Sequence, residues 1–200
     1  MSELPRPPEV IDTQRLSLRR PTLSDAQSIF RSYATDPAVT RFLLWQPHSD
    51  LNVTRLFIAQ CERSWVERSA YRWVVETRQE GELLGMVSAH VSGHAVELGS
   101  VLARGAWGHG YIAEALRPIA DWALAQEQVF RVWAVCDVDD ERSTRVLAKL
   151  GMQREGYLRK WVVHPNLSPV PRDCWCYACV KSSGLSLEPG AGAATPQTPD

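Results

Sequence analysis

Three glycines, Gly105, Gly108 and Gly110, stand directly before a segment whose apolar residues recur every three or four positions. This spacing predicts an amphipathic helix from about residue 111, with an apolar face of Ile112, Ala115, Leu116, Ile119, Trp122 and Ala123. Glycine lets the backbone come close to a ligand, and the N–H groups at a helix N-terminus attract anions. A tight turn without a ligand needs only one glycine. The three glycines therefore predict an anion site suited to a pyrophosphate.

Two kinds of pyrophosphate site fit these glycines, and the first is a dinucleotide site. Residues 108–113 match the pattern G-x-G-x-x-A. A dinucleotide-binding fold opens with this unit, however, whereas here about 100 residues with other strand and helix patterns precede it. The acidic residue expected about 20 positions later is also missing, because the nearest, Asp137, follows a whole further helix. A dinucleotide site stays an alternative.

The second kind is a coenzyme A site, and three segments resemble one protein family. Residues 107–116, WGHGYIAEAL, resemble the pyrophosphate motif of the GNAT superfamily of N-acetyltransferases. Residues 135–156 and the opening Thr13–Arg19 are similar to its RimJ/RimL branch, which modifies ribosomal-protein N-termini. The resemblance covers about residues 11–181. It implies a GNAT-like α+β (mixed α/β) fold, with a central mixed, mostly antiparallel twisted sheet flanked by helices.

The resemblance also implies a co-substrate and its contacts. Acetyl-CoA is the expected acetyl donor, with its pantetheine in a gap where the strand at 97–102 diverges from the strand at 131–137. Backbone N–H groups near Val101 or Leu102 are then expected to face the thioester oxygen. No metal is expected. The expected cofactor-binding residues are Val101, Leu102, Gly105, Gly108, His109, Gly110, Tyr111, Ile112, Asp140 and Ser143.

Three positions depart from the family pattern. Gly105 stands where Gln or Arg is frequent, His109 where a basic residue is frequent, and Asp140 where the branch has Asn. An ionised carboxylate accepts hydrogen bonds but does not donate them, so the contact of Asp140 with the cofactor is left open. Independently of any cofactor, Asp140 predicts the N-cap of a helix at 141–150.

Acetyl transfer needs a neutral amine and a leaving thiolate that can be protonated. A free α-amine has a pKa of about 8 and a lysine of about 10.4, so a general base is useful. By the resemblance, Glu97 is the expected base, directly or through water, because the family carries Glu in an E-x-G strand motif here. Ser143 matches the family serine that meets the coenzyme sulfur. The alternatives are an ordinary exposed strand residue for Glu97 and a first-turn serine bonded to backbone for Ser143.

Apolar periodicity predicts the elements that position these residues. The loop His164–Asp173 joins the last two strands and is expected to influence acceptor specificity. Helices are expected from Ser24-Asp25 to Asp36-Pro37, at 50–68, from about 111 and at 141–150. Strands are expected at 15–19, 72–77, 83–91, 96–102, 131–137, 157–163 and 174–180.

Composition sets the class of protein. The 200 residues carry a formal net charge of −1 and are 44% hydrophobic, which predicts one globular domain and gives no reason to expect nucleic acid or an anionic membrane as partner. No apolar run approaches the roughly 18 residues of a membrane span, and no secretory signal is visible. We expect a cytoplasmic monomer or homodimer, with a domain at 11–181 between disordered segments at 1–10 and 182–200.

Five cysteines are an odd number, which argues against a disulfide framework. Cys174, Cys176 and Cys179 form one cluster, but their spacing is not a common zinc pattern. Alternation of Cys174 and Cys176 with Trp175 and Tyr177 predicts a buried strand instead.

Together these observations predict an acetyl-CoA-dependent N-acetyltransferase that acts by direct attack of a primary amine on the thioester. The acceptor is either a protein N-terminal α-amine or a small-molecule amine. The alternative is a GNAT fold that binds acyl-CoA as a sensor or interaction module without catalysis. Turnover with an amine distinguishes the two.

Overall fold

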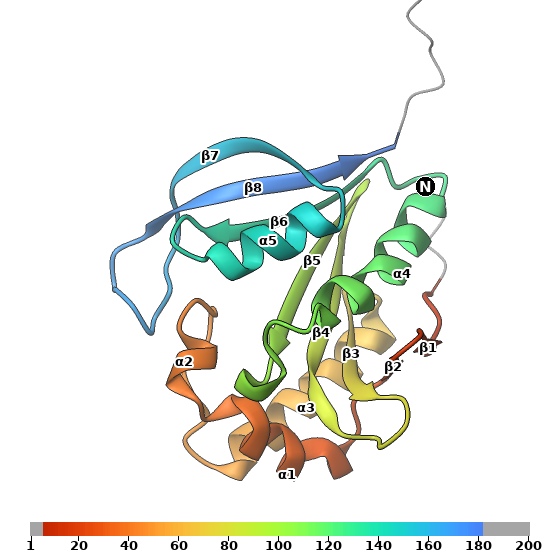
Figure 1. Cartoon of the computed structure of the whole chain (residues 1–200), viewed down its shortest axis with the longest axis vertical. Helices are drawn as coiled ribbons and strands as arrows, with labels where there is room; N and C mark the ends of the chain where they lie inside the picture. Colours follow the sequence, from red (N-terminus) through yellow and green to blue (C-terminus); the bar gives the residue numbers. More distant parts are fainter. Residues whose placement is uncertain (1–5, 182–200) are drawn as a thin grey trace, which may run out of the picture.

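The computed structural model describes residues 6–181 of the chain (Figure 1). Its strands form one sheet in the order β1-β2-β3-β4-β5-β6-β8-β7. Neighbouring strands are antiparallel, except that β5 and β6 are parallel. The predicted mixed, mostly antiparallel sheet is therefore confirmed. The strands are β1 (Val10–Asp12), β2 (Leu16–Arg19), β3 (Ala70–Thr77), β4 (Leu83–Ser92), β5 (Ala95–Leu102), β6 (Arg131–Asp137), β7 (Gln153–Val162) and β8 (Arg172–Val180).

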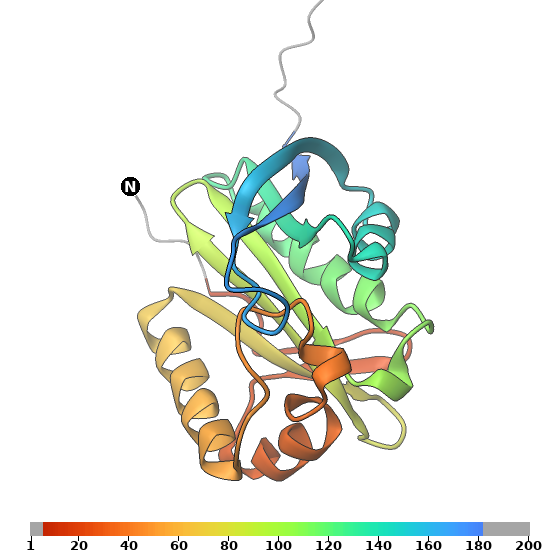
Figure 2. The same ribbon diagram turned by 90° about the vertical axis from the view of Figure 1, so that its left-hand side faces the viewer.

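Helices cover both faces of the sheet (Figures 1 and 2). On one face lie α4 (Tyr111–Ala125) and α5 (Glu141–Lys149), which contribute to the larger apolar core. On the other lie α1 (Ala26–Ile29), η2 (Phe30–Ala34) and α3 (Leu51–Glu67), which pack a second core against β3 and β4. The sheet thus separates an α4–α5 face from an α1–α3 face.

Strand alternation decides which helices each residue of β5 meets. Val96 and Leu98 point to the α4–α5 face and join its core, whereas Val101 packs against the core of the α1–α3 face. Leu116 and Ile119 of α4 lie in the same core as Val96 and Leu98 and are almost fully buried. Each contributes about 2 kcal/mol through burial of its apolar surface. This packing fixes the start of α4 relative to the end of β5.

The first helical segment differs from the predicted single helix. The 3₁₀ turn η1 (Leu23–Asp25), α1 and the π-helical η2 follow one another without a break. Thr22, not Ser24, precedes the first turn, and its backbone N–H donates to the carboxylate of Asp25 at 2.7 Å. The hydroxyl of Ser24 instead shares a hydrogen bond with that of Thr22.

Asp36-Pro37 ends this segment as predicted, and the same pair also begins a short helix that the sequence reasoning missed. The helix α2 spans Pro37–Thr40. Its N-cap is Asp36, whose carboxylate accepts a hydrogen bond from the N–H of Ala38 at 2.8 Å. Proline is well suited to the first helical position because its missing N–H has no partner there.

Residues 1–5 and 182–200 lie outside the described residues, so the predicted terminal segments and domain limits stay predictions there. On the N-terminal side, β1 begins at Val10, inside the segment expected to be disordered. The indole Nε1 of Trp73 also donates to the carbonyl of Pro8 at 3.0 Å. Proline lacks a donor but keeps its acceptor, so a Pro-rich segment can still be held against the sheet. Within residues 6–181, no helix is both long and apolar enough to cross a membrane.

Candidate active site

The parallel strands β5 and β6 separate partway along their length. Their ladder ends at the pair Glu97 and Trp133, although β5 continues to Leu102 and β6 to Asp137. Beyond that pair the facing strand edges are not joined by a ladder to each other, so their backbone groups do not pair across the gap. The divergence that the family resemblance implied is therefore present. We call this gap between β5 and β6 the fork.

The register with β4 decides which backbone groups of β5 face the fork. The N–H of Ala103 donates to the carbonyl of Leu84 at 2.7 Å, and hydrogen-bonded pairs alternate along an antiparallel ladder. Leu102 therefore directs its N–H and carbonyl away from β4, whereas Val101 directs its own toward β4. The carbonyl of Val101 accordingly lies against Gly85. Of the two predicted backbone donors, only Leu102 faces the fork.

The loop after β5 is fixed to both sides of the fork by one tryptophan. The indole Nε1 of Trp107 donates to the carbonyl of Leu102 at 2.9 Å. The guanidinium carbon of Arg142, on α5, lies 3.7 Å from the centroid of the Trp107 ring, a cation–π contact. The loop at 103–110 is thus held at the end of β5 and also touches the first turn of α5.

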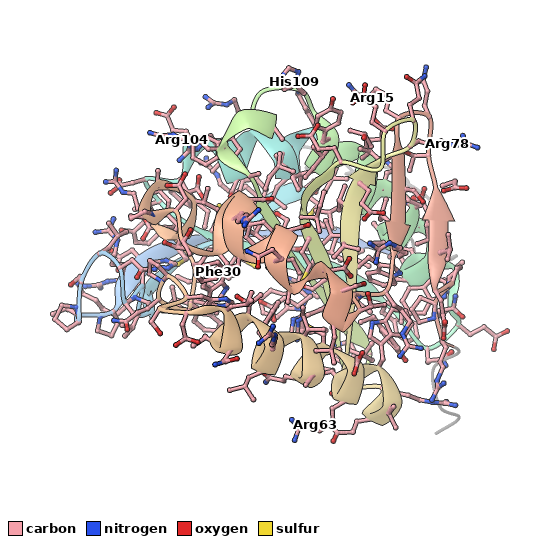
Figure 3. The ribbon with its side chains drawn as sticks, turned by 90° about the horizontal axis from the view of Figure 1, so that it is seen from below. Arg15, Phe30, Arg63, Arg78, Arg104 and His109 are labelled. Atoms are coloured by element: carbon pink, nitrogen blue, oxygen red, sulfur yellow. The ribbon has the colours of Figure 1, made fainter. Side chains whose placement is uncertain are left out.

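The N-terminus of α4 is open. Gly110 is its N-cap and has a φ of +80°, and Gly108 has a φ of +85°, so these two positions need glycine. Among the described residues, none caps the helix with a side chain. The N–H groups of the first turn therefore remain available to an anion. Exposed Arg104 and His109 lie along the same side of the molecule (Figure 3).

Arg15 holds this helix start in place. Its Nε donates to the Glu114 carboxylate at 2.7 Å, and its Nη1 donates to the carbonyl of His109 at 3.1 Å. Thr13 adds a hydroxyl bond to the same carboxylate at 2.6 Å. Burial raises the pKa of Glu114, but the bonds from Thr13 and Arg15 outweigh it and hold the pKa below its usual range. Sequence reasoning missed this contact, although Glu114 in the first turn was a visible signal.

The N-terminus of α5 is closed. The carboxylate of Asp140 accepts the N–H of Ser143 at 3.2 Å and the hydroxyl of Ser143 at 2.7 Å. The predicted N-cap is therefore confirmed. The hydroxyl proton of Ser143 points to Asp140, and only the oxygen lone pairs of Ser143 remain to face a ligand.

Glu97 lies at the point where the fork opens. It is the last β5 residue paired with β6, its side chain points to the α1–α3 face, and it is half-buried. Burial raises the pKa of its carboxyl group above the usual value. Directly opposite Glu97 in the β4–β5 ladder is His90, whose pKa is lowered by burial and by the charge of Arg72. Sequence reasoning had found no role for His90, because only the register brings it to Glu97.

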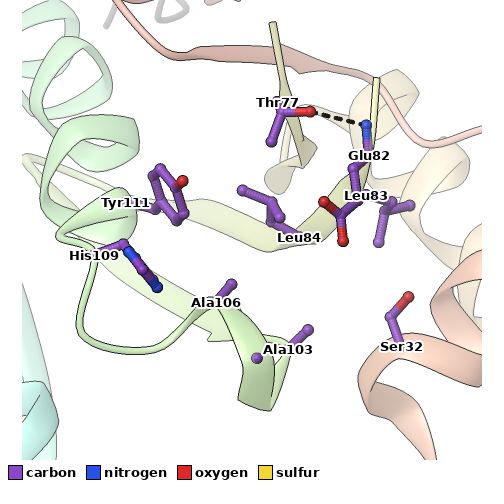
Figure 4. Close-up of a pocket in the computed structure, with 10 residues that line it drawn as sticks. Ser32, Thr77, Glu82, Leu83, Leu84, Ala103, Ala106, His109 and Tyr111 are labelled. Carbon is purple, nitrogen blue, oxygen red and sulfur yellow. Dashed lines mark hydrogen bonds between the residues drawn. The ribbon is translucent and has the colours of Figure 1, made fainter. Parts of the chain in front are cut away.

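Two of the predicted contact residues use their side chains elsewhere. Ile112 is 7% exposed and belongs to the core, so only its backbone can face an anion. The Tyr111 ring stacks on His109, with ring centroids 5.5 Å apart. Both His109 and Tyr111 line a cavity of about 340 Å³ that lies toward the β3–β4 hairpin rather than toward β6 (Figure 4).

The loop His164–Asp173 lies against the segment around α2. Asn166 donates from its side-chain amide to the carbonyls of Thr40 at 2.7 Å and Trp45 at 2.8 Å. Nearby, Arg172 donates to the buried carboxylate of Asp137 at 2.5 and 2.9 Å. These contacts join the β7–β8 loop to the α1–α3 face, on the side to which Glu97 points.

The cysteine cluster lies on β8, as predicted. Cys174 and Cys176 are buried, while Cys179 packs against the α4–α5 core from the opposite side of the strand. Among the described residues, no group of three His, Cys, Asp or Glu side chains is placed to hold a metal ion.

Comparison with known proteins gives the family. A model described as an acetyltransferase (GNAT) domain matches residues 15–153. The uncharacterized N-acetyltransferase YoaA of Bacillus subtilis is 28% identical over 175 residues, which cover 86% of this chain and 97% of that protein. The uncharacterized N-acetyltransferase p20 of Bacillus licheniformis is 29% identical over 157 residues, which cover 76% and 87%.

Solved structures share the fold. A GNAT-family acetyltransferase from Bacillus anthracis has a TM-score of 0.75 at 24% identity, over 87% of this chain and 99% of that chain. The self-immunity acetyltransferase MccE, solved with acetyl-CoA and AMP, has a TM-score of 0.79 at 19% identity, covering 88% and 98%. RimL, a ribosomal L7/L12 α-N-protein acetyltransferase solved with coenzyme A, has a TM-score of 0.77 at 19% identity, over 86% of this chain and 98% of that chain.

Proposed function

This chain belongs to the GNAT acetyltransferase family, and from that premise we propose that it transfers the acetyl group of acetyl-CoA to a primary amine. The fork, with the open N-terminus of α4 beside it, is the observation that carries the proposal. We propose that the acceptor is either the α-amine of a protein or a small-molecule amine. RimL acts on a protein N-terminus by its name, which makes that acceptor the first to assay.

The residues around the fork fit a coenzyme. The first-turn N–H groups of α4, from Tyr111 onward, suit the pyrophosphate, since they are uncapped within the described chain and at the positive end of the helix dipole. Gly108 and Gly110 let the backbone adopt the left-handed conformations that this turn needs. Exposed Arg104 and His109 add donors at the same edge. Acetyl-CoA supplies the activated acetyl group, and the chain supplies binding and proton transfer.

The reaction assigns one task to each group at the fork. The amine nitrogen forms a bond to the thioester carbon, and the C–S bond breaks to release the coenzyme thiolate. We assign Glu97 to accept the amine proton, because a carboxylate whose pKa is raised is a better base near neutral pH. We assign the N–H of Leu102 to donate to the thioester oxygen as it gains charge.

Ser143 is our candidate for protonating the thiolate. Its hydroxyl donates to Asp140 at 2.7 Å, so this role requires that the hydroxyl turn away from Asp140 during the reaction. Asp140 therefore fixes the orientation of the Ser143 side chain, but it also holds the hydroxyl proton that the thiolate would need. Activity that is unchanged in Ser143→Ala would remove this assignment.

Binding is the first experiment. Calorimetric titration of the full chain with acetyl-CoA, and in parallel with NAD, is expected to give one-to-one micromolar binding of acetyl-CoA alone. Absence of binding to acetyl-CoA would contradict the proposal, and binding of NAD would support the dinucleotide alternative.

Turnover is the second experiment. Release of free coenzyme thiol is followed with a peptide that has a free α-amine, with an N-blocked lysine peptide and with small amines. Glu97→Gln is expected to lower the rate by about 100-fold or more while acetyl-CoA still binds. Tight binding of acetyl-CoA without thiol release for any amine would favour the sensor alternative.

A further inference from the structure

His90 and Glu97 are directly opposed in the β4–β5 ladder. Opposed residues of neighbouring strands project from the same face, with their Cβ atoms about 5 Å apart. Both side chains are half-buried. Within residues 6–181, neither makes a hydrogen bond or ion pair through its side chain. Two unused titratable groups therefore lie together where the fork opens.

The next pair on the same face, Ser88 and Gly99, leaves space beside His90 and Glu97. Ser88 is opposite Gly99, and a Cβ on Gly99 would lie 2.6 Å from the Ser88 hydroxyl oxygen. Glycine two positions after Glu97 thus leaves room for a hydroxyl group in the sheet surface. Ser88, His90 and Glu97 form a polar strip on the α1–α3 face, with Arg72 opposite Ser88 on β3, and the strip borders the apolar core of that face at Val74 and Met86.

The pKa values of the two titratable groups in the polar strip are shifted in opposite directions. Burial raises the pKa of Glu97, and burial together with the Arg72 charge lowers the pKa of His90. Other charged groups on this face of the described chain are paired: Arg131 with Glu155 at 2.6 Å, Asp137 with Arg172, and Arg19 with Asp25 and Glu76. Arg72 lies directly opposite Ser88 in the β3–β4 ladder and donates to the hydroxyl of Ser64. The ordinary pKa of a glutamate lies about 2 units below that of a histidine, so these opposite shifts bring the two groups closer together and lower the free-energy cost of moving a proton between them.

We propose that His90 is a positioning residue that works through Glu97: its imidazole orients the carboxylate and takes the proton that Glu97 removes from the acceptor ammonium. The inference rests on the proposed function and deepens it. The proton moves from the ammonium nitrogen to a Glu97 oxygen, then to an imidazole nitrogen and on to water. The amine lone pair that is released attacks the thioester carbon, so no oxidant or reductant is needed.

The test compares His90→Gln with His94→Gln in the full chain. His94 is an exposed histidine in the β4–β5 turn, away from Glu97, and its substitution is expected to change nothing. His90→Gln is expected to lower kcat/KM for the amine about tenfold, with the affinity for acetyl-CoA unchanged. The acidic limb of its pH profile is expected to lose one of two ionisations. Combined with Glu97→Gln, it is expected to cause no further loss, because coupled groups are not additive.

A second measurement does not depend on activity. The imidazole titration of His90, followed by NMR in wild type and in Glu97→Gln, is expected to shift between the two proteins. Equal titration curves, or an H90Q variant with wild-type kcat/KM and pH profile, would overturn the inference while leaving the acetyltransferase proposal intact. Failure of the wild type to release thiol with any amine would instead contradict the proposed function.

Discussion

The N-termini of α4 and α5 follow the two strands that form the fork, and they are built in opposite ways. α4 begins at Gly110 and receives no side-chain cap from the described residues. α5 begins at Asp140, whose carboxylate takes both the N–H and the hydroxyl of Ser143. A carboxylate at the N-cap takes up one first-turn N–H and repels a phosphate, whereas an uncapped helix start attracts it. We therefore propose the phosphate site at the N-terminus of α4 and not at that of α5, although both helices follow strands of the fork.

The acidic residue in the first turn of α4 does not weaken this contrast. Glu114 is neutralised by Arg15, whose guanidinium lies 2.6 Å from it, and by the hydroxyl of Thr13. Its negative charge therefore serves to fix the N-terminal segment to the helix. Asp140 has no such basic partner among the hydrogen bonds and ion pairs of the described chain.

Placing a carboxylate at the open end is expected to have the largest effect. Gly110→Asp should weaken acetyl-CoA binding at least about 100-fold, or about 3 kcal/mol, measured by calorimetry. Gly81→Asp is the matched control, because Gly81 has a similar φ of +67° and open space around it, but lies in the β3–β4 turn. If the two variants bind acetyl-CoA equally well, the α4 N-terminus is not the phosphate site.

The next largest effect is expected on stability in acid, where Asp137 at the end of β6 should contribute more than Glu114 in α4. Burial raises the pKa of Asp137, but the bonds from Arg172 and from the N–H of Asp139 outweigh it and hold the pKa below 3.8. A lowered folded-state pKa means that the charge stabilises the fold above the ordinary pKa. This stabilisation disappears as the pH falls through the lower folded-state value.

The measurement is the change in Tm between pH 7 and pH 3. We expect Asp137→Asn to shrink that change more than Glu114→Gln does, because the side chain of Asp137 is fully buried and that of Glu114 is 19% exposed. An equal change in the two variants would show that burial does not determine how much each carboxylate contributes to stability.

Removal of the Arg15 side chain is expected to have a smaller effect on stability and on binding. Arg15→Ala should destabilise the fold by about 1 kcal/mol or less, since the Arg15 side chain is 45% exposed. It should weaken acetyl-CoA binding about fivefold, because the loop before α4 loses its anchor at the His109 carbonyl. Arg78→Ala is the control: Arg78 donates to the carbonyl of Thr13 at 3.1 Å, but within residues 6–181 its side chain makes no hydrogen bond or ion pair with the loop. Equal affinities in both variants would show that the anchor is not needed.

The smallest effect is expected at the N-terminus of α5, where Asp140 is the N-cap. Asp140→Asn keeps a good N-cap and removes the negative charge, so acetyl-CoA should bind about threefold more tightly with little change in Tm. Asp140→Ala should lower stability by about 1 kcal/mol through loss of the cap. Weaker binding in Asp140→Asn would mean that the carboxylate contacts the cofactor favourably, and that the capped N-terminus of α5 does not repel it.

The sequence predicted most strands of the sheet and the glycine-rich N-terminus of α4, because both depend on residues that are close together in the chain. The glycines at 108 and 110 are needed at positive φ, and the cap at Asp140 depends on residues three positions away. The fork itself came from the family resemblance rather than from periodicity. Short elements such as β1 and α2 were missed, since three or four residues carry too little pattern to be recognised.

What the sequence determined by itself is what neighbouring residues decide: the glycine turn, the helix that follows, its apolar face and the cap of α5. The tertiary structure alone decided the rest. Arg15 meets Glu114 across 99 positions, His90 meets Glu97 through strand register, and register also turns Leu102 rather than Val101 toward the fork. Turns and caps depend on backbone angles within one segment, whereas register and ion pairs depend on how distant segments pack.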